Sequence, residues 1–220
     1  MAGHDWDDKL PEEQGQKWKQ LCEDVKNFDH IIARKTVPAG SAAKLVLFAD
    51  ARSHAMASCA HIVDISNSHL LFAKSRLPNV RKGPTIPKLE INAVTMATRM
   101  AHTVYTALKE RTNVSSILIL TDSEIALSWL VRHPIQKDAG VLVRNRVTEI
   151  RRIVNEIDKP IRFGHISTEH NPANCATRGL SANELVDHSW WNGPPFLLCQ
   201  KRAGRRKINT SSLRKTHKEN

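Results

Sequence analysis

The order of the predicted elements indicates a mixed α/β sheet with helices packed on both of its faces. Three short apolar stretches with turn residues between them, typical of an antiparallel meander, lie at 44–50, 55–63 and 69–75. Two helical periodicities and two further strands then alternate along the chain, at 89–111, 114–122, 139–157 and 161–167. Hairpin-joined strands followed by alternating helices and strands predict a mixed five-stranded sheet, three strands antiparallel and two parallel.

Each element has its own signal. The meander begins with KLVLFAD, an apolar run that ends on Asp50, and polar turn residues at 64–68 separate its second and third strands. Six apolar residues at helical spacing predict the long helix over 89–111. The strand over 114–122 ends on Asp122, and a short helix is expected over 123–131. After the last strand, 171–185 is expected to form a turn and then a helix.

Composition divides the chain into four segments. Residues 1–40 form an acidic segment with a helix whose apolar residues Trp18, Leu21, Val25 and Phe28 could pack on something outside this chain. The folded domain is expected over 41–186 and a linker containing WWNGPP over 187–200. The basic, polar residues 201–220 are expected to be disordered.

Charge favours a polyanionic partner. Lys and Arg number 33 against 22 Asp and Glu, a net charge of +11. The excess lies outside the N-terminal region, because residues 1–30 hold eight acidic and four basic residues. Such a surface suits nucleic acid, since neutralised phosphates release counterions, although a solvated basic surface is an equally plain interpretation.

Cysteines and apolar runs exclude several classes of protein. Cys22, Cys59, Cys175 and Cys199 form no CxxC pair, which argues against a zinc knuckle and against a disulfide framework. The acidic N-terminus does not resemble a signal peptide. No apolar stretch approaches the roughly 20 residues that span a bilayer, so we expect an intracellular protein without membrane contact.

Three carboxylates lie where a metal site would place them. Asp50 and Asp122 end two strands, and Glu90 opens the long helix. If those strands are neighbours, the three meet in one crevice that solvent can reach. Magnesium prefers such oxygen ligands, and two ions about 4 Å apart can drive phosphodiester hydrolysis. Taken singly, each acid is more simply explained as a turn residue, a helix-dipole partner or an N-cap.

Seven motifs in order resemble the ribonuclease H region of Bel/Pao-type LTR retrotransposon polyproteins. They are FADARS (48–53), LLFAKSRL (70–77), TIPKLEINA (85–93), LTDSEIALSWL (120–130), RNRVTEI (144–150), HNPANCATRG (170–179) and WWNGPP (190–195). The opening WDDKLPEE-W resembles the connection segment that follows reverse transcriptase there. The resemblance therefore implies a ribonuclease H-like fold over 41–186 and a connection segment over 1–40.

The same resemblance implies a chemistry. It assigns Asp50, Glu90 and Asp122 to two Mg²⁺ ions, with Mn²⁺ as an alternative, and RNA–DNA hybrid as the substrate. The family carries a fourth carboxylate in its last motif, where this sequence has Asn174. An amide oxygen can ligate a divalent ion but brings no charge. A catalytically weakened or inactive nucleic-acid-binding remnant is therefore the alternative function, and the reverse transcriptase domain of the parent polyprotein is an expected partner.

Other candidates surround this set. The resemblance also implies a histidine near the last motif that assists proton transfer or product release: His165 has the matching spacing, His170 is its rival, and a solvated loop histidine is the plain alternative for each. Five bases between the third strand and Glu90 are expected to hold phosphates, or to lie in a solvated loop: Lys74, Arg76, Arg81, Lys82 and Lys88. Trp129, Trp190 and Trp191 could stack on bases, although packing explains them better.

Overall fold

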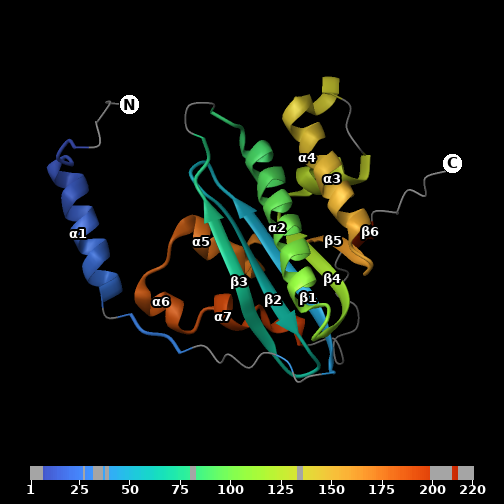
Figure 1. Ribbon diagram of the computed structural model, residues 1–220. Coiled ribbons are helices and arrows are strands. Elements are labelled where there is room, and N and C mark those ends of the chain that lie inside the picture. Colours follow the sequence, from blue (N-terminus) through green and yellow to red (C-terminus); the bar gives the residue numbers. More distant parts are fainter. Residues whose placement is uncertain are drawn as a thin grey trace.

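The computed structural model describes residues 7–26, 28–31, 37, 40–79, 83–132, 136–198 and 210–212. Within this part of the chain, one sheet with strand order β3-β2-β1-β4-β5-β6 forms the centre of the molecule (Figure 1). The strands are β1 (Ala42–Ala51), β2 (Met56–Val63), β3 (Ser68–Arg76), β4 (Asn113–Thr121), β5 (Ile161–His165) and β6 (Thr210–Ser212). β1, β2 and β3 pair antiparallel, while β4 pairs parallel with both β1 and β5.

The predicted mixed sheet of three antiparallel and two parallel strands is confirmed. The structure adds a short sixth strand, because β6 pairs antiparallel with β5. This strand lies inside the basic tail for which we expected disorder, and the rest of 201–220 lies outside the described residues.

β1 is the central strand because its residues are apolar on both sides. Leu45, Leu47 and Ala49 belong to the larger hydrophobic core, whereas Val46 and Phe48 belong to the smaller one. Period-two alternation places these two sets on opposite faces of the sheet. A strand that is apolar on both faces has to be covered on both, and helical segments do this here.

The larger core is covered by three helices. They are α2 (Ile86–Leu108), α3 (Glu124–Arg132) and α4 (Gln136–Glu156), and Figure 1 shows α2 lying along the sheet. α2 buries a face that includes Leu89, Ile91 and Val94 against the strands, and α4 packs beside it. The helix predicted over 139–157 is present but interrupted, because Gly140 has φ 81° and ψ 167°.

The other face is covered by short segments in place of the single helix expected within 171–185. These are η2 (Thr168–His170), η3 (Pro172–Asn174), α5 (Cys175–Arg178), α6 (Ala182–Val186), α7 (Ser189–Asn192) and η4 (Pro195–Leu197). Gly179, with φ 79°, ends α5 and prevents a continuous helix. Trp190, Phe196 and Leu197 pack on the smaller core, so WWNGPP lies on the sheet instead of acting as a free linker.

α1 (Glu12–Lys26) stands apart from the sheet (Figure 1). It has no buried residue, and Trp18, Leu21 and Val25 are all more than half exposed. Phe28 lies beyond the end of the helix. Across the residues that the structure describes, no helix has both the length and the apolar character to cross a membrane.

Candidate active site

The three predicted carboxylates lie at one end of the sheet. β1 and β4 are parallel neighbours, with Ala49 beside Thr121, so that Asp50 and Asp122 both come at the carboxyl ends of adjacent strands. Glu90 is one turn into α2, which begins at this end and crosses the sheet. The topology therefore brings together three acids that are far apart in the sequence.

Their electrostatics show that they act on one another. Burial raises the pKa of Asp50, and the charge of Asp122 raises it further, while Arg178 and Arg52 lower it. Burial also raises the pKa of Glu90, with further increases from Asp122 and Asp50. Like charges close enough to raise the pKa values of Asp50 and Glu90 form the kind of cluster that a bound cation would stabilise.

Each carboxylate accepts a hydrogen bond from a hydroxyl group. Ser123 Oγ donates to Glu90 Oε2 at 2.5 Å, and Thr168 Oγ1 donates to Asp122 Oδ2 at 2.7 Å. Thr177 Oγ1 donates to Asp50 Oδ2. These hydroxyls were not among the residues predicted from the sequence. Of the three, only Ser123 could have been found from the sequence, because it directly follows Asp122 at the start of the predicted helix.

Asn174 contacts both of the threonines whose hydroxyls donate to the aspartates. Its side-chain Nδ2 donates to the backbone carbonyl oxygen of Thr168. Its backbone carbonyl oxygen accepts from Thr177 Oγ1 at 3.1 Å. Its Oδ1 is buried and has no hydrogen-bond partner among the residues that the structure describes. An unsatisfied buried acceptor calls for a missing donor or ion, and here it belongs to the residue expected as the fourth ligand.

Access to the site is uneven. Glu90 and Asp122 are partly exposed, whereas only 5% of Asp50 is exposed, less than we expected of a carboxylate in an open crevice. Among the described residues, no three His, Cys, Asp or Glu side chains are arranged so that they could hold an ion together. The carboxylates are thus neighbours, but each is turned to its hydroxyl donor.

The segment that carries Asn174 is tied to the end of β1. Asn171 Nδ2 donates to the carbonyl oxygen of Ala49 at 3.0 Å, and Asn171 Oδ1 accepts from the backbone amide of Ala173 at 3.1 Å. Asn171 is itself buried. The HNPAN motif is therefore fixed beside Asp50 by a buried side chain that has partners on both sides.

The two histidine candidates differ in position. His165 is the last residue of β5 and pairs with Thr121, the residue that precedes Asp122. Its side chain is partly exposed. The Nδ1 atom of His170 lies 2.7 Å from Ser167 Oγ and 3.4 Å from a Glu169 carboxylate oxygen. His165 thus shares the end of the sheet that holds the carboxylates, while His170 belongs to an exposed local cluster.

The predicted basic cluster is only partly described. Lys74 and Arg76 are exposed on β3 and Lys88 is in the first turn of α2, whereas Arg81 and Lys82 lie outside the described residues. The tryptophans are packed. Trp129 lies against the larger core and Trp190 against the smaller one. Trp191 donates from Nε1 to the carbonyl oxygen of Leu185 at 2.7 Å.

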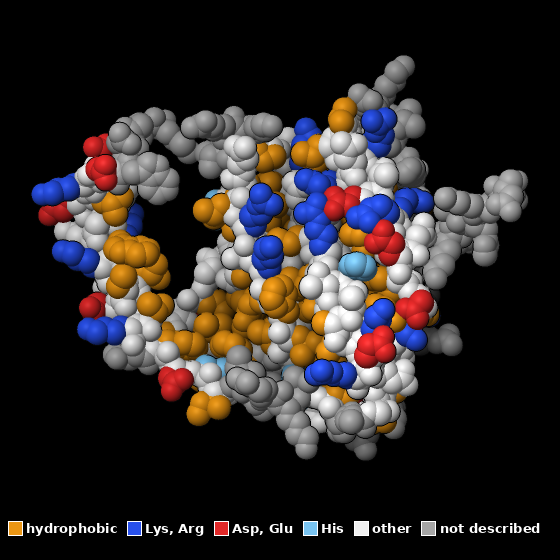
Figure 2. All heavy atoms as spheres, in the orientation of Figure 1, with side chains coloured by type: hydrophobic (Ala, Val, Ile, Leu, Met, Phe, Trp, Pro, Cys, Tyr) orange, Lys and Arg blue, Asp and Glu red, His pale blue; other side chains and the backbone are white. Residues whose placement is uncertain are grey.

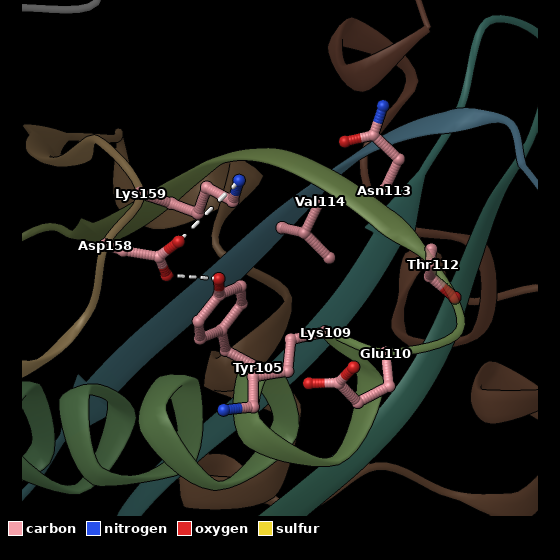
Figure 3. A pocket seen from close by; sticks show the side chains of 8 residues that line it. All are labelled: Tyr105, Lys109, Glu110, Thr112, Asn113, Val114, Asp158 and Lys159. Atoms are coloured by element: carbon pink, nitrogen blue, oxygen red, sulfur yellow. Dashed lines mark hydrogen bonds and ion pairs between the residues drawn. The ribbon is translucent and has the colours of Figure 1, made fainter.

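A hollow of about 300 Å³ lies at the opposite end of α2 (Figure 3). There the hydroxyl of Tyr105 donates to Asp158, and this bond raises the pKa of the phenol to about 12. Lys159 Nζ lies 3.8 Å from the other oxygen of Asp158. These partners already satisfy one another, and the hollow shares no residue with the carboxylate cluster.

Comparison with protein families gives one match. The model of the Pao retrotransposon-like RNaseH-like domain matches residues 1–123, a range that includes all three carboxylates and ends before His165 and Asn174. No curated protein matches the chain.

Several solved structures are similar to the chain. RNase H1 from the halophilic archaeon Halobacterium salinarum NRC-1 is 15% identical over 66% of this chain and 98% of that one, with a TM-score of 0.41. LC11-RNase H1, solved in complex with RNA/DNA hybrid, is 16% identical over 66% and 96%, also with a TM-score of 0.41. The foamy viral protease-reverse transcriptase with RNA/DNA hybrid is 16% identical over 80% and 26%, with a TM-score of 0.37.

Proposed function

Since the chain belongs to the Pao retrotransposon-like RNaseH-like domain family, we propose that it hydrolyses the RNA strand of RNA–DNA hybrids. The observation that carries this proposal is the position of Asp50 and Asp122 at the carboxyl ends of the parallel neighbours β1 and β4, with Glu90 of α2 close enough for their charges to raise its pKa. Parallel strand ends are where α/β sheets bind ligands. The cations described on β3 and at the start of α2, from Lys74, Arg76 and Lys88, suit a phosphate backbone.

In the type of its donor atoms the set suits magnesium, with manganese as the alternative. Asp50, Glu90 and Asp122 supply carboxylate oxygens, and the unpartnered Oδ1 of Asn174 supplies a neutral one. When bound, a pair of such ions activates a water molecule and stabilises the leaving oxygen of a phosphodiester. Because Asn174 brings no charge, we expect the divalent ion on its side of the site to bind more weakly.

The residues of the chain have distinct tasks in this reaction. Ser123, Thr168 and Thr177 orient the three carboxylates through their hydroxyl groups. Water attacks the phosphorus atom, the bond to the 3′-oxygen breaks, and that oxygen leaves with a proton. His165, at the end of β5, is the group that we assign to moving this proton.

The proposal is tested by cleavage of an end-labelled RNA–DNA hybrid in Mg²⁺ or Mn²⁺. We expect RNA fragments with 3′-hydroxyl and 5′-phosphate ends, and no cleavage of duplex DNA. Asp122→Asn keeps the shape of the side chain but removes its charge, so it should abolish the activity. Absence of cleavage by the wild-type chain with either metal, or full activity of Asp122→Asn, would refute the proposal.

A second candidate function is favoured by Asn174 itself. The chain is then a nucleic-acid-binding remnant that retains the fold but turns over slowly or not at all. The absence of a converged acidic metal group among the described residues supports it. Hybrid binding that weakens steeply with salt, without cleavage, would select this function. Asn174→Asp distinguishes the two, because it should raise the cleavage rate only if a missing charge limits an intact site.

We also propose that α1 packs on the reverse transcriptase domain of the parent polyprotein. Trp18, Leu21 and Val25 share the helical spacing of a buried face, yet they are exposed here. Co-purification of the chain with that domain, lost on Trp18→Ala and retained in a variant of the exposed Lys19, would support this partner. Equal co-purification of both variants would argue against it.

A further inference from the structure

A groove between β3 and α2 lies outside the carboxylate site. Its volume is about 630 Å³, within the roughly 300–1000 Å³ range of sites for small ligands. Phe72, Lys74 and Arg76 from β3 line one side, and Met96 and Arg99 from α2 line the other. Figure 2 shows Lys and Arg side chains gathered over this part of the molecule, with hydrophobic side chains beside them. The groove therefore combines positive charge with an apolar floor.

The β3 side presents an aromatic ring next to two cations. Phe72, Lys74 and Arg76 occupy alternate positions on the strand and so point to the same face. All three are exposed, and 49% of the Phe72 side chain is open to solvent. The cations that line the same groove make the exposed ring suited to a ligand with both a planar base and a phosphate.

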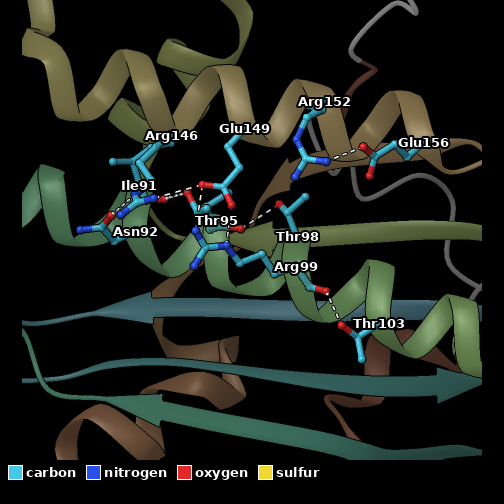
Figure 4. Close-up of polar contacts among 11 residues, drawn as sticks. Ile91, Asn92, Thr95, Thr98, Arg99, Thr103, Arg146, Glu149, Arg152 and Glu156 are labelled. Carbon is cyan, nitrogen blue, oxygen red and sulfur yellow. Dashed lines mark hydrogen bonds and ion pairs between the residues drawn. The ribbon is translucent and has the colours of Figure 1, made fainter.

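The helical side holds two further cations in fixed orientations (Figure 4). Arg99 donates to both carboxylate oxygens of Glu149, at 2.6 and 2.9 Å. Arg146 donates to Glu149 at 3.0 Å and to Asn92 Oδ1 at 2.8 Å. The single carboxylate of Glu149 thus accepts hydrogen bonds from two guanidinium groups, which leaves an excess of positive charge on this side.

From this arrangement we propose that the groove binds a single-stranded segment of nucleic acid. The base stacks on Phe72, and Lys74 and Arg76 contact successive phosphates, with the Arg99–Arg146 pair adding a fixed positive field. Stacking is open only to unpaired bases, which is why a single strand is the occupant. The site acts independently of hydrolysis, and it lies along the middle of α2, the helix that carries Glu90 near its start.

The test is the binding of a fluorescein-labelled single-stranded oligothymidylate to the full chain, followed by fluorescence anisotropy over a series of salt concentrations. Lys74→Ala with Arg76→Ala should weaken binding at least tenfold. It should also lower the slope of log K against log salt by about 1.4, since each phosphate contact on a single strand contributes about 0.7. Lys109→Ala with Arg111→Ala removes the same charge at the far end of α2 and should leave the slope unchanged.

Phe72→Leu separates stacking from charge. It keeps an apolar side chain on β3 but removes the π-face, so binding should fall about fivefold or more while the salt slope stays the same. Equal slope changes in the two double variants, or unchanged binding by Phe72→Leu, would overturn the proposal. Equally tight binding of a polyglutamate peptide at this groove would assign it to an acidic protein instead. Asp122→Asn should bind the single strand like the wild type, so failure of the hydrolytic function and failure of this site are distinguishable.

Discussion

At the scale of single residues, the carboxylate site depends on three hydroxyl groups. Asp50 is the most buried of the three acids, and Thr177 is the neighbour whose hydrogen bond most opposes the rise in its pKa. The same hydroxyl also donates to the backbone of Asn174. Thr177 therefore connects the central strand to the segment that carries the proposed fourth ligand.

Replacing this hydroxyl should destabilise the protein. Thr177→Val has nearly the same shape but leaves the buried oxygen of Asp50 without its donor, so we expect the free energy of unfolding to fall by about 1–3 kcal/mol. Thr177→Ser keeps the donor and should lose much less. Chemical denaturation at neutral pH measures both variants. Equal stability of the valine and serine variants would show that the bond to Asp50 contributes little.

His61 gives a second prediction at this scale. It is fully buried, its Nε2 lies 2.9 Å from the carbonyl oxygen of Trp190, and its ring packs edge-on to Phe48. Burial lowers its pKa to about 4, against 6.5 for an exposed histidine. The unfolded chain therefore takes up a proton on this side chain at a higher pH than the folded chain does.

Stability should consequently fall as the solution is acidified from about pH 6.5 to pH 4. The contribution of His61 to the free energy of unfolding is fully present above pH 6.5. It is lost as the pH falls to the folded-state pKa of about 4, a difference of about 3 kcal/mol. Thermal unfolding of wild type and His61→Gln across this range measures it, because the variant lacks the titrating group. Parallel pH dependences in the two proteins would contradict the assignment.

The positions of the acids could be predicted from the sequence, but their surroundings could not. Asp50 and Asp122 follow apolar runs and Glu90 opens an amphipathic helix, so local patterns were enough to place them at element ends. The donor to Asp50 is 127 residues away in the chain. No local pattern encodes a contact of that range, and the burial of Asp50 results from the same distant segment.

At the scale of elements, the C-terminal segments depend on one close approach. An added Cβ at Gly193 would lie 2.5 Å from Leu197 Cδ1 and 3.0 Å from Ser68 Oγ, and its φ of +69° disfavours other residues. Leu197 and Ser68 are both buried. The tight turn after α7 thus lets η4 pack on the smaller core.

Gly193→Ala should therefore destabilise the protein more than Gly179→Ala. Both glycines have positive φ, but an added Cβ at Gly179 meets nothing within 4 Å. We expect backbone strain of about 1–3 kcal/mol in each variant, with a further 1–3 kcal/mol from overpacking in Gly193→Ala alone. Denaturant titration compares the two. Losses of the same size would mean that Leu197 and Ser68 move aside without cost.

Helices and strands were predicted well where the period of the apolar residues and the length of the segment indicated the same type of element. Every strand of the meander and the long helix α2 could be read from apolar patterns, with differences of a few residues at their ends. The region after β5 could not, because its short helical turns are set by Gly179, Gly193 and packing on the sheet. The short polar strand β6 has no apolar pattern, so only its pairing with β5 defines it.

At the scale of the whole molecule, the two ends of the sheet differ in character. One end brings together Asp50, Glu90 and Asp122, and the basic groove runs between β3 and the middle of α2. The other end holds Tyr105 and Asp158 in a self-satisfied contact. The net charge of +11 predicted a polyanionic partner from composition alone, but only the fold locates the acidic cluster and the basic groove relative to each other.

The central claim is that three acids, brought together by parallel strand ends, hold divalent ions. It is tested most directly by anomalous diffraction from crystals of the full chain soaked with Mn²⁺. We predict a peak bounded by the carboxylates of Asp50, Glu90 and Asp122, which disappears in Asp122→Asn crystals soaked in the same way. No peak at that position in the wild type, with the carboxylates still bonded to Ser123, Thr168 and Thr177, would contradict the account.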